Sequence, residues 1–318
     1  MAAGNRATKR FDLVVFGEFF SDLIFYGLSH EPRLGEEVKT RSFLIAPGGG
    51  LATSAIAAQR LGSRTAVITR VGGDVSTLPT WAEIVHEGLD ISACEVQKGK
   101  PTALTVSAAY RSNRMMLTHD PINEHLEDLL TKRSVIDTLH RARHVHFACA
   151  LRQPARWIPV MEALRDAGIT VSANFGWNPD LSAKELLSIV KHCEFIFPNE
   201  NEAKAITGSR TALDAIAKLV DWCHIPVVKL ARGGAVLVAN GKRHRHAAPS
   251  LPVIDATGAS DAFDGGFLHA FLQGAGWDEC LQTGNICSSL CATQPGGLKG
   301  LPTQRELRLS LRKSPLHA

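Results

Sequence analysis

The chain has 318 residues, 45% hydrophobic and 21% charged, and a net charge of only +4, which fits a globular protein with a large core and argues against a nucleic-acid partner. No apolar run is long enough to span a membrane, no signal peptide opens the chain, and the seven cysteines follow no disulfide framework. We therefore expect a cytoplasmic protein with reduced thiols and no membrane partner.

Strands and helices alternate along most of the chain. Residues 11–27 begin as an apolar strand, break at Gly17 and continue as a second apolar stretch, which indicates a core strand that leads into a different layer. An alanine-rich helix over 51–62 precedes a strand at 65–72. We expect further strands at 144–151, 168–175, 194–199 and 226–231, and helices at 155–167, 182–191, 201–206 and 211–222.

These strands are continuous apolar runs, as in sheets that are covered on both faces. The sequence therefore predicts a three-layer α/β/α sandwich with a mainly parallel central sheet. Segments 35–46 and 101–118 differ, because apolar and polar residues alternate there. We expect a small β-strand lid, built from about 23–46 and 101–118, within one domain that spans 1–318. An exposed lid edge also favours a homodimer.

The stretch DATGASDAFDGGF, residues 255–267, places small residues between two aspartates just before an apolar run. A helix over 262–273 would hold the N–H groups of residues 258–261 at its positive end, where they bind anions. Asp261 would then accept a proton from an attacking hydroxyl. The competing interpretation is that Asp261 only caps the helix.

Other polar residues follow predicted strands. Ligands of open parallel sheets bind beyond the carboxyl ends of the strands. Asp22, the PGGG stretch at 47–50, Asn174, Asn199 and the segment 230–234 all fall in such connections. Neither the GxGxxG dinucleotide fingerprint nor a GxxxxGK[ST] P-loop is present, so phosphate binding must use another device.

Four stretches of this sequence together resemble the PfkB (ribokinase-like) carbohydrate kinases. DATGASDAF resembles the DTxGAGD signature near the C-terminus of that family, and PGGGLATSAIAAQRLG resembles its first signature. PNENEA at 198–203 is similar to the NxxE element, and VVKLARGGAVLV at 227–238 is similar to the nucleotide-loop strand. The matches run in family order from about residue 12 to residue 300.

The resemblance implies ATP-dependent phosphorylation of a hydroxyl group on a sugar or sugar-like molecule. It implies that Asp261 is the catalytic base and that the N–H groups of Gly258, Ala259 and Ser260 form an anion hole. It also implies roles for residues that bind the two substrates and the ions. These are Asp22, Gly48, Gly49 and Thr53 for the sugar; Asn199, Lys229, Gly234 and Asn285 for ATP; Glu202 for Mg²⁺ through water; and Asp255 with the Thr257 carbonyl for a monovalent cation such as K⁺.

The sequence departs from the family pattern at four positions. Thr53 replaces an asparagine of the first signature, Ser260 the last glycine of GAGD, Ala231 a nucleotide-loop glycine, and Ser172 the aspartate of a DxN element that ends at Asn174. A serine at residue 260 suits an anion hole if its φ is negative, because the donors are main-chain N–H groups. Because of these departures, a second interpretation remains, in which the chain is a non-catalytic ligand-binding or regulatory relative of this family.

A nucleoside kinase of the same fold is the second alternative. It requires an aromatic or apolar slot under the lid, and Phe25, Tyr26 and Phe43 are candidates for one. His144 and His146 lie on a predicted core strand, so we interpret them as structural residues rather than ligands. Specificity depends on lid and pocket side chains, so the acceptor stays open between sugars and nucleosides.

Overall fold

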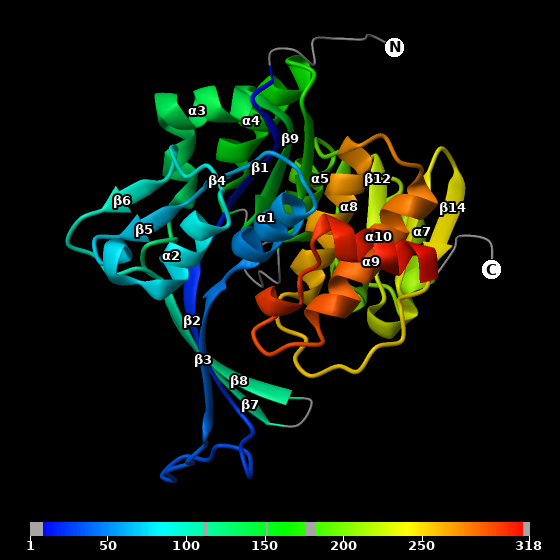
Figure 1. The fold of residues 1–318 in the computed structure, drawn as a ribbon. Coiled ribbons are helices and arrows are strands. Elements are labelled where there is room, and N and C mark those ends of the chain that lie inside the picture. Colours follow the sequence, from blue (N-terminus) through cyan, green and yellow to red (C-terminus); the bar gives the residue numbers. More distant parts are fainter. Residues whose placement is uncertain (1–8, 111–112, 151, 176–181, 314–318) are drawn as a thin grey trace.

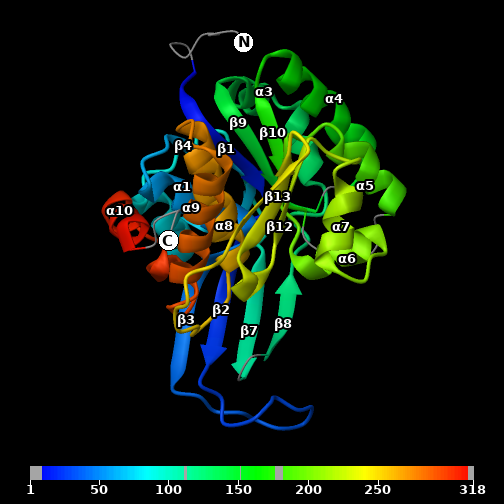
Figure 2. The same ribbon diagram turned by 90° about the vertical axis from the view of Figure 1, so that its right-hand side faces the viewer.

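The computed structural model describes residues 9–110, 113–150, 152–175 and 182–313. It has three layers, with a central eight-stranded sheet between two sets of helices (Figures 1 and 2). The predicted α/β/α sandwich is therefore confirmed. The strand order is β14-β13-β12-β11-β10-β9-β1-β4, and only the β12–β13–β14 pairings are antiparallel. The strands are β1 (Phe11–Gly17), β4 (Thr65–Ile68), β9 (Ala142–Ala148), β10 (Thr170–Ala173), β11 (Phe195–Ile196), β12 (Ile225–Lys229), β13 (Ala235–Ala239) and β14 (Lys242–His246).

The central strands are apolar throughout because both faces of the sheet are covered. On β1, Leu13 and Val15 pack into the core on one face, while Val14 and Phe16 pack into the core on the other. The first face carries α1 (Gly50–Arg60), α8 (Ala259–Leu272) and α9 (Trp277–Cys291), with α10 (Gln304–Lys313) against α9 (Figure 2). The second face carries α3 (Arg133–His140), α4 (Pro154–Asp166), α5 (Ala183–Val190), α6 (Glu200–Thr207) and α7 (Ala212–Leu219).

Smaller elements complete the described chain. The predicted strand at 65–72 divides after Ile68, because the chain leaves the central sheet there and pairs elsewhere. The second part, β5 (Arg70–Gly72), pairs in parallel with β6 (Glu95–Gln97) next to α2 (Pro79–His86). Short 3₁₀ turns occur at Val75–Thr77, Leu126–Thr131, Ala231–Gly233 and Leu298–Gly300.

A separate four-stranded sheet projects from one end of the sandwich, as the lid prediction requires (Figure 1). Its order is β3-β2-β7-β8, formed by β2 (Phe20–Tyr26), β3 (Ser42–Gly48), β7 (Leu104–Tyr110) and β8 (Asn113–His119). The predicted segments 35–46 and 101–118 do not pair with each other, because β2 lies between them. Residues 35–41 belong to no strand.

Two glycines set how closely α8 packs on its neighbours. A Cβ atom on Gly265 would collide with the backbone carbonyl of Ser54 in α1. A Cβ atom on Gly266 would lie 2.6 Å from the Cys287 sulfur in α9. The glycines therefore allow α8 to lie directly against both helices, and the close contact with α1 brings the amino ends of these two helices together.

We expect Gly265→Ala to lower the free energy of unfolding by about 2–3 kcal/mol, because the Ser54 carbonyl belongs to a helix backbone and cannot rotate away. Gly266→Ala is the matched comparison and should lose only about 1 kcal/mol, since its neighbour is the end of a side chain. Urea denaturation measures both losses. Equal losses, or an unchanged Gly265→Ala protein, would contradict this packing account.

Candidate active site

Two helix amino ends and the carboxyl ends of several parallel strands meet at one edge of the sheet. Gly49 precedes α1 with φ 84°, and Gly258 precedes α8 with φ 73°. Both residues have a positive φ, which glycine adopts without strain. Asn174 follows β10 and Asn199 lies beyond β11, at the same edge. Asn174 and Asn199 therefore lie at the predicted edge, whereas Asp22 lies within β2 of the lid rather than in a connection after a strand.

Three successive glycines separate two of the predicted site carboxylates. A Cβ atom on Gly48 would collide with the carboxylate of Asp22, and one on Gly50 would lie 3.1 Å from Asp261 Oδ1. The side-chain-free backbone of residues 48–50 thus lies against Asp22 at one end and Asp261 at the other, with the Glu18 carbonyl against Gly49. Gly50 was not singled out from the sequence, although it belongs to the same PGGG run.

Helix α8 begins at Ala259, three residues earlier than the sequence predicts, so Asp261 lies in its first turn. The turn closes locally, with Ala259 N–H donating to the Ala256 carbonyl over 3.2 Å. Among the described residues, the N–H groups of Gly258 and Ser260 donate no hydrogen bond. Gly258 is the N-cap and has no side chain, so Asp261 is not the cap of this helix.

The four departures from the family pattern have different structural consequences. Ser260 has a negative φ inside the helix, so it adds no backbone strain. Ala231 has φ 48°, a left-handed conformation that costs a residue with a Cβ about 1 kcal/mol or more. Thr53 is buried in α1, and its hydroxyl oxygen lies 3.0 Å from the Cβ position of Gly258. Thr53 therefore supports the turn that precedes α8.

Ser172 lies in the core rather than at the sheet edge. Its hydroxyl is 2.7 Å from His144 Nε2 and 2.8 Å from His146 Nδ1. Burial lowers the pKa of His144 to about 3 and lowers that of His146 as well. Both rings are therefore neutral, and a serine between them avoids the buried charge that an aspartate would bring. The structural interpretation of the two histidines fits this geometry.

A cavity of about 310 Å³ adjoins the turn at Gly258. All four residues predicted to bind the nucleotide line it, together with two of the turn. These are Asn199, Lys229, Gly234, Asn285, Ala259 and Ser260. Asn285 also donates to the His246 carbonyl over 2.9 Å, which fixes the segment after β14 beside Gly234.

The ammonium group of Lys229 is buried in an ion pair that the sequence did not reveal. It lies 2.9 Å from Oδ1 of Asp264, a residue of α8 with no solvent exposure. Burial raises the pKa of Asp264 to about 7, although Lys229 acts against this. The Asn174 amide nitrogen lies 2.6 Å from Asp264 Oδ2 and 3.2 Å from Asp261 Oδ1. The spacing of Asp261 and Asp264, three residues apart, is the helical signal that places both on one face.

Asn199 and Glu202 form a capping box at the start of α6. The Asn199 side chain accepts from Glu202 N–H over 3.0 Å, and Glu202 Oε2 accepts from Asn199 N–H over 2.9 Å. Glu202 does not line the 310 Å³ cavity, whereas its neighbours Glu200 and Asn201 do. The second oxygen of Glu202, Oε1, accepts no hydrogen bond among the described residues.

Asp255 ties the loop before α8 to the segment after α9. Its Oδ1 accepts from the Thr257 N–H and hydroxyl over 3.0 and 2.7 Å, and its Oδ2 accepts from Gly296 N–H over 2.9 Å. The Thr257 carbonyl faces Gly297, where a Cβ atom would collide with it. In the described structure the Asp255 carboxylate therefore serves as a loop anchor.

Glu18, which sequence reasoning missed, directly follows β1. Burial raises the pKa of Glu18 to about 7, and the charge of Asp120 raises it further, whereas Arg152 lowers it. Its Oε1 accepts from Ala150 N–H over 3.4 Å. A glutamate directly after a predicted apolar strand was the available signal, because this position lies at the carboxyl end of the sheet.

The aromatic slot suggested for a nucleoside base does not form from all three candidates. Phe25 and Phe43 are cross-strand partners, with ring centroids 4.9 Å apart. Strand alternation places them on the face of the lid opposite to Asp22, and only Tyr26 shares the Asp22 face. Two of the three rings therefore point away from the site.

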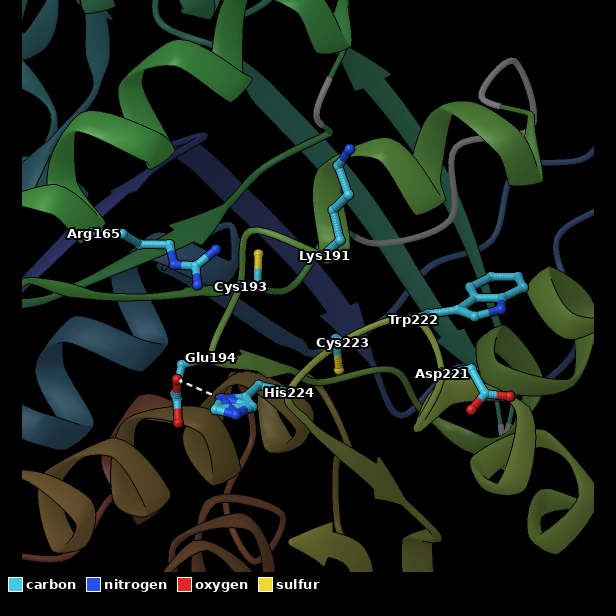
Figure 3. Close-up of a pocket in the computed structure, with 8 residues that line it drawn as sticks. All are labelled: Arg165, Lys191, Cys193, Glu194, Asp221, Trp222, Cys223 and His224. Atoms are coloured by element: carbon cyan, nitrogen blue, oxygen red, sulfur yellow. Dashed lines mark hydrogen bonds and ion pairs between the residues drawn. The ribbon is translucent and has the colours of Figure 1, made fainter. Parts of the chain in front are cut away.

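A second cavity, of about 290 Å³, lies at the opposite, amino ends of β11 and β12 (Figure 3). Its lining includes Arg165, Lys191 and the His224–Glu194 pair, whose atoms are 3.2 Å apart. No residue predicted for the site lies there. Among the residues that the structure describes, no helix is long and apolar enough to cross a membrane.

Comparisons with known proteins agree with this geometry. A model of the pfkB family carbohydrate kinase matches residues 10–304. The chain is 26% identical over 304 residues to the ribokinase of Haemophilus influenzae, covering 92% of this chain and 96% of the ribokinase. It is 28% identical over 246 residues to the cytidine kinase of Thermococcus kodakarensis, covering 75% and 84% of the two chains.

A solved structure shows the same fold. The ribokinase of Arabidopsis thaliana complexed with ribose and ATP superposes with a TM-score of 0.82 at 23% identity, covering 95% of this chain and 99% of that one. The family match extends from before β1 to the start of α10, and so includes the lid, both helix amino ends and the cavity at Lys229. The chain belongs to the pfkB family of carbohydrate kinases.

Proposed function

We propose that the protein transfers the γ-phosphoryl group of ATP to a hydroxyl group of a sugar or sugar-like molecule. The observation that supports this most is the side-chain-free backbone of residues 48–50, which lies between Asp22 and Asp261 beside the turn at Gly258. An acceptor bound at this backbone would meet a carboxylate at each end. The nucleotide cavity reaches the same turn, because Ala259 and Ser260 line it.

The Asp261 carboxylate and the turn at Gly258 would have different roles in the transfer. Asp261 accepts the proton of the acceptor hydroxyl while the hydroxyl oxygen attacks the γ-phosphorus. The bond from that phosphorus to the bridging oxygen breaks, and ADP leaves with the electron pair. The N–H groups of Gly258 and Ser260 lie at the positive end of α8 and would stabilise the charge on the transferred group, whereas the Ala259 N–H donates to the Ala256 carbonyl. Asp22 and the backbone at Gly48 and Gly49 hold the acceptor.

We assign Mg²⁺ to the neighbourhood of Glu202. The described residues contain no cluster of three or more His, Cys, Asp or Glu side chains able to hold a metal ion, which fits an ion that keeps most of its water. Glu202 Oε1 lies outside the capping box and would accept from such a water. Bound Mg²⁺ neutralises phosphate charge during transfer.

A monovalent cation such as K⁺ is a separate part of the proposal. The Thr257 carbonyl is a suitable oxygen ligand, whereas the three donors on Asp255 leave its carboxylate to shape the loop. The dependence of turnover on KCl concentration tests this assignment. We also propose a cytoplasmic location, in line with the seven free cysteines.

The acceptor class is tested by measuring ADP formation with Mg²⁺ and ATP against pentoses, hexoses, sugar acids and nucleosides. We expect the highest kcat/KM with a neutral sugar, because Phe25 and Phe43 face away from the site and supply no slot for a base. A nucleoside as the best acceptor would favour the cytidine kinase relatives instead. Acceptor-independent ADP formation, or none at all, would favour a binding protein without turnover.

The lid also suggests how two copies associate. Register places several apolar side chains on the lid face opposite to Asp22, and four of them are exposed: Phe43 at 47%, Ile45 at 39%, Met115 at 46% and Leu117 at 65%. A continuous apolar face of this kind is unfavourable in water. We propose that a second copy of the chain covers it.

We expect Asp261→Asn to lower kcat by about 10²- to 10⁴-fold, because the amide cannot accept the hydroxyl proton. The KM for ATP and the melting temperature should change little, since Gly258 rather than Asp261 caps α8. Glu279→Gln is the control, because it removes an acidic group from the first turn of α9. An Asp261→Asn enzyme with normal kcat would rule out the assigned base.

We expect Glu202→Gln to raise the Mg²⁺ concentration needed for half-maximal turnover by about 10-fold or more, because a neutral amide binds Mg²⁺-bound water less strongly. The fold should persist, since glutamine also completes a capping box. Glu185→Gln changes the equivalent capping box of α5 and is the matched control. An unchanged Mg²⁺ requirement would remove Glu202 from the site.

We expect Phe43→Asp to convert a dimer into a 34.3 kDa monomer, because a carboxylate would be buried unpaired between two lids. Leu309→Asp is the control, because Leu309 is equally exposed at 47% but lies on α10. Light scattering coupled to size-exclusion chromatography measures both masses. A dimeric Phe43→Asp protein, or a monomeric parent chain, would refute the lid dimer.

A further inference from the structure

The Lys229 ammonium contacts three acceptors that all belong to the first turns of α8. Besides Asp264 Oδ1, it lies 3.2 Å from Asp264 Oδ2 and 3.3 Å from the Ser260 carbonyl. Lys229 itself is the last residue of β12 and is only 6% exposed. One buried cation therefore connects a strand end to the turn that is proposed to bind the phosphoryl group.

Asp264 extends this connection to the proposed base. Both oxygens of its fully buried carboxylate accept hydrogen bonds, Oδ1 from Lys229 and Oδ2 from Lys229 and Asn174. The Asn174 amide also donates to Asp261 Oδ1. An amide between two carboxylates is fixed in orientation, because only its NH₂ group can face them. Asn174, which follows β10, thus holds the Asp261 side chain, and Asp264, in the same helix as Asp261, holds Asn174.

The charges around Asp264 come from three packed elements. Lys229 of β12 supplies a positive charge, and Asp261 of α8 supplies a negative one that raises the Asp264 pKa. His146 of β9 also faces Lys229, and its ring is neutral because burial, His144 and Lys229 all lower the His146 pKa. Lys229 is therefore the cation that balances the two carboxylates within this described cluster.

A buried ion pair of this kind is a poor way to gain stability, because removing two charges from water costs as much as their attraction returns. Such a pair instead fixes the orientation of the groups around it, since each donor and acceptor has one defined partner. We propose that Lys229 and Asp264 are positioning residues for the phosphoryl transfer, with Asp264 orienting Asp261 through Asn174 and Lys229 orienting the Ser260 peptide. This inference rests on the proposed function of Asp261.

Asp264→Asn is the most informative single change, because an amide has only one oxygen. If the oxygen of the new asparagine faces Lys229, its NH₂ group meets the NH₂ group of Asn174, and two donors face each other. If the oxygen faces Asn174 instead, the NH₂ group of the new asparagine meets the Lys229 ammonium, which is also a donor. The variant keeps the shape of the side chain but cannot satisfy both partners. The link to Asp261 is therefore broken with little change in volume.

We expect Asp264→Asn to lower kcat by about 10- to 100-fold while the KM for ATP stays nearly constant. The kcat/KM profile should also lose the contribution that the raised pKa of Asp264 makes near neutral pH, because the amide does not titrate. Glu87→Gln is the control, since it breaks a half-buried pair with Arg60 far from the turn. That variant should lose stability without a shift of the profile.

The double variant Lys229→Met with Asp264→Leu separates positioning from stability. Apolar residues of similar volume should restore the melting temperature that Asp264→Asn loses. They provide no acceptor for Asn174, so kcat should stay low. Recovery of kcat together with the melting temperature would show a purely structural pair and overturn the inference, as would Asp264→Asn with unchanged kcat and pH profile.

A spectroscopic measurement tests the same link without turnover. The side-chain amide protons of Asn174 should exchange slowly with solvent in the parent protein, because they donate to Asp264 and Asp261, and should exchange faster in Asp264→Asn. Equal exchange rates in the two proteins would refute the link. If the rates differ but no acceptor supports ADP formation, the proposed kinase function fails, whereas the hydrogen bonds from Asn174 to the two carboxylates are supported.

Discussion

The close contact of α1 with α8 is the constraint on which the site depends. Because Gly265 has no side chain, the backbone of α8 lies against the Ser54 carbonyl, and the amino ends of both helices reach the same edge of the sheet. That contact sets Asp261 beside Gly50 and the Gly258 turn beside Thr53. The proposed acceptor site and the proposed anion-binding turn therefore both depend on one packing interface in the core.

Charge compensation between buried side chains is the second constraint on the site. The site edge gathers the carboxylates of Asp22, Asp261 and Asp264, and burial of Asp264 is costly unless a cation accompanies it. Lys229 is that cation, and its contact with the Ser260 carbonyl joins charge compensation to the geometry of the turn. The proposed nucleotide cavity and the proposed base are thus connected through one buried network, rather than being two independent groups of residues.

The sequence predicted the layers, and it indicated a helix start near Asp261, because both depend on local patterns. Continuous apolar strands indicate a covered parallel sheet, and the small residues before Asp261 indicate a helix start. Long-range contacts were not visible in the same way. The place of β2 between β3 and β7 and the Lys229–Asp264 pair depend on partners that are distant in the sequence. The start of α8 at Ala259 depends on how the preceding turn closes. The inward position of Ser172 likewise depends on histidines of a neighbouring strand.

The most direct test of the account is a crystal structure of the protein with ADP, Mg²⁺, aluminium fluoride and the best acceptor from the substrate panel. The account predicts the fluoride group against the N–H groups of Gly258 and Ser260, with the acceptor hydroxyl between it and Asp261 and the sugar over residues 48–50. The nucleotide should occupy the cavity lined by Asn199 and Asn285. A fluoride group elsewhere, or an acceptor hydroxyl that does not contact Asp261, would contradict the central claim.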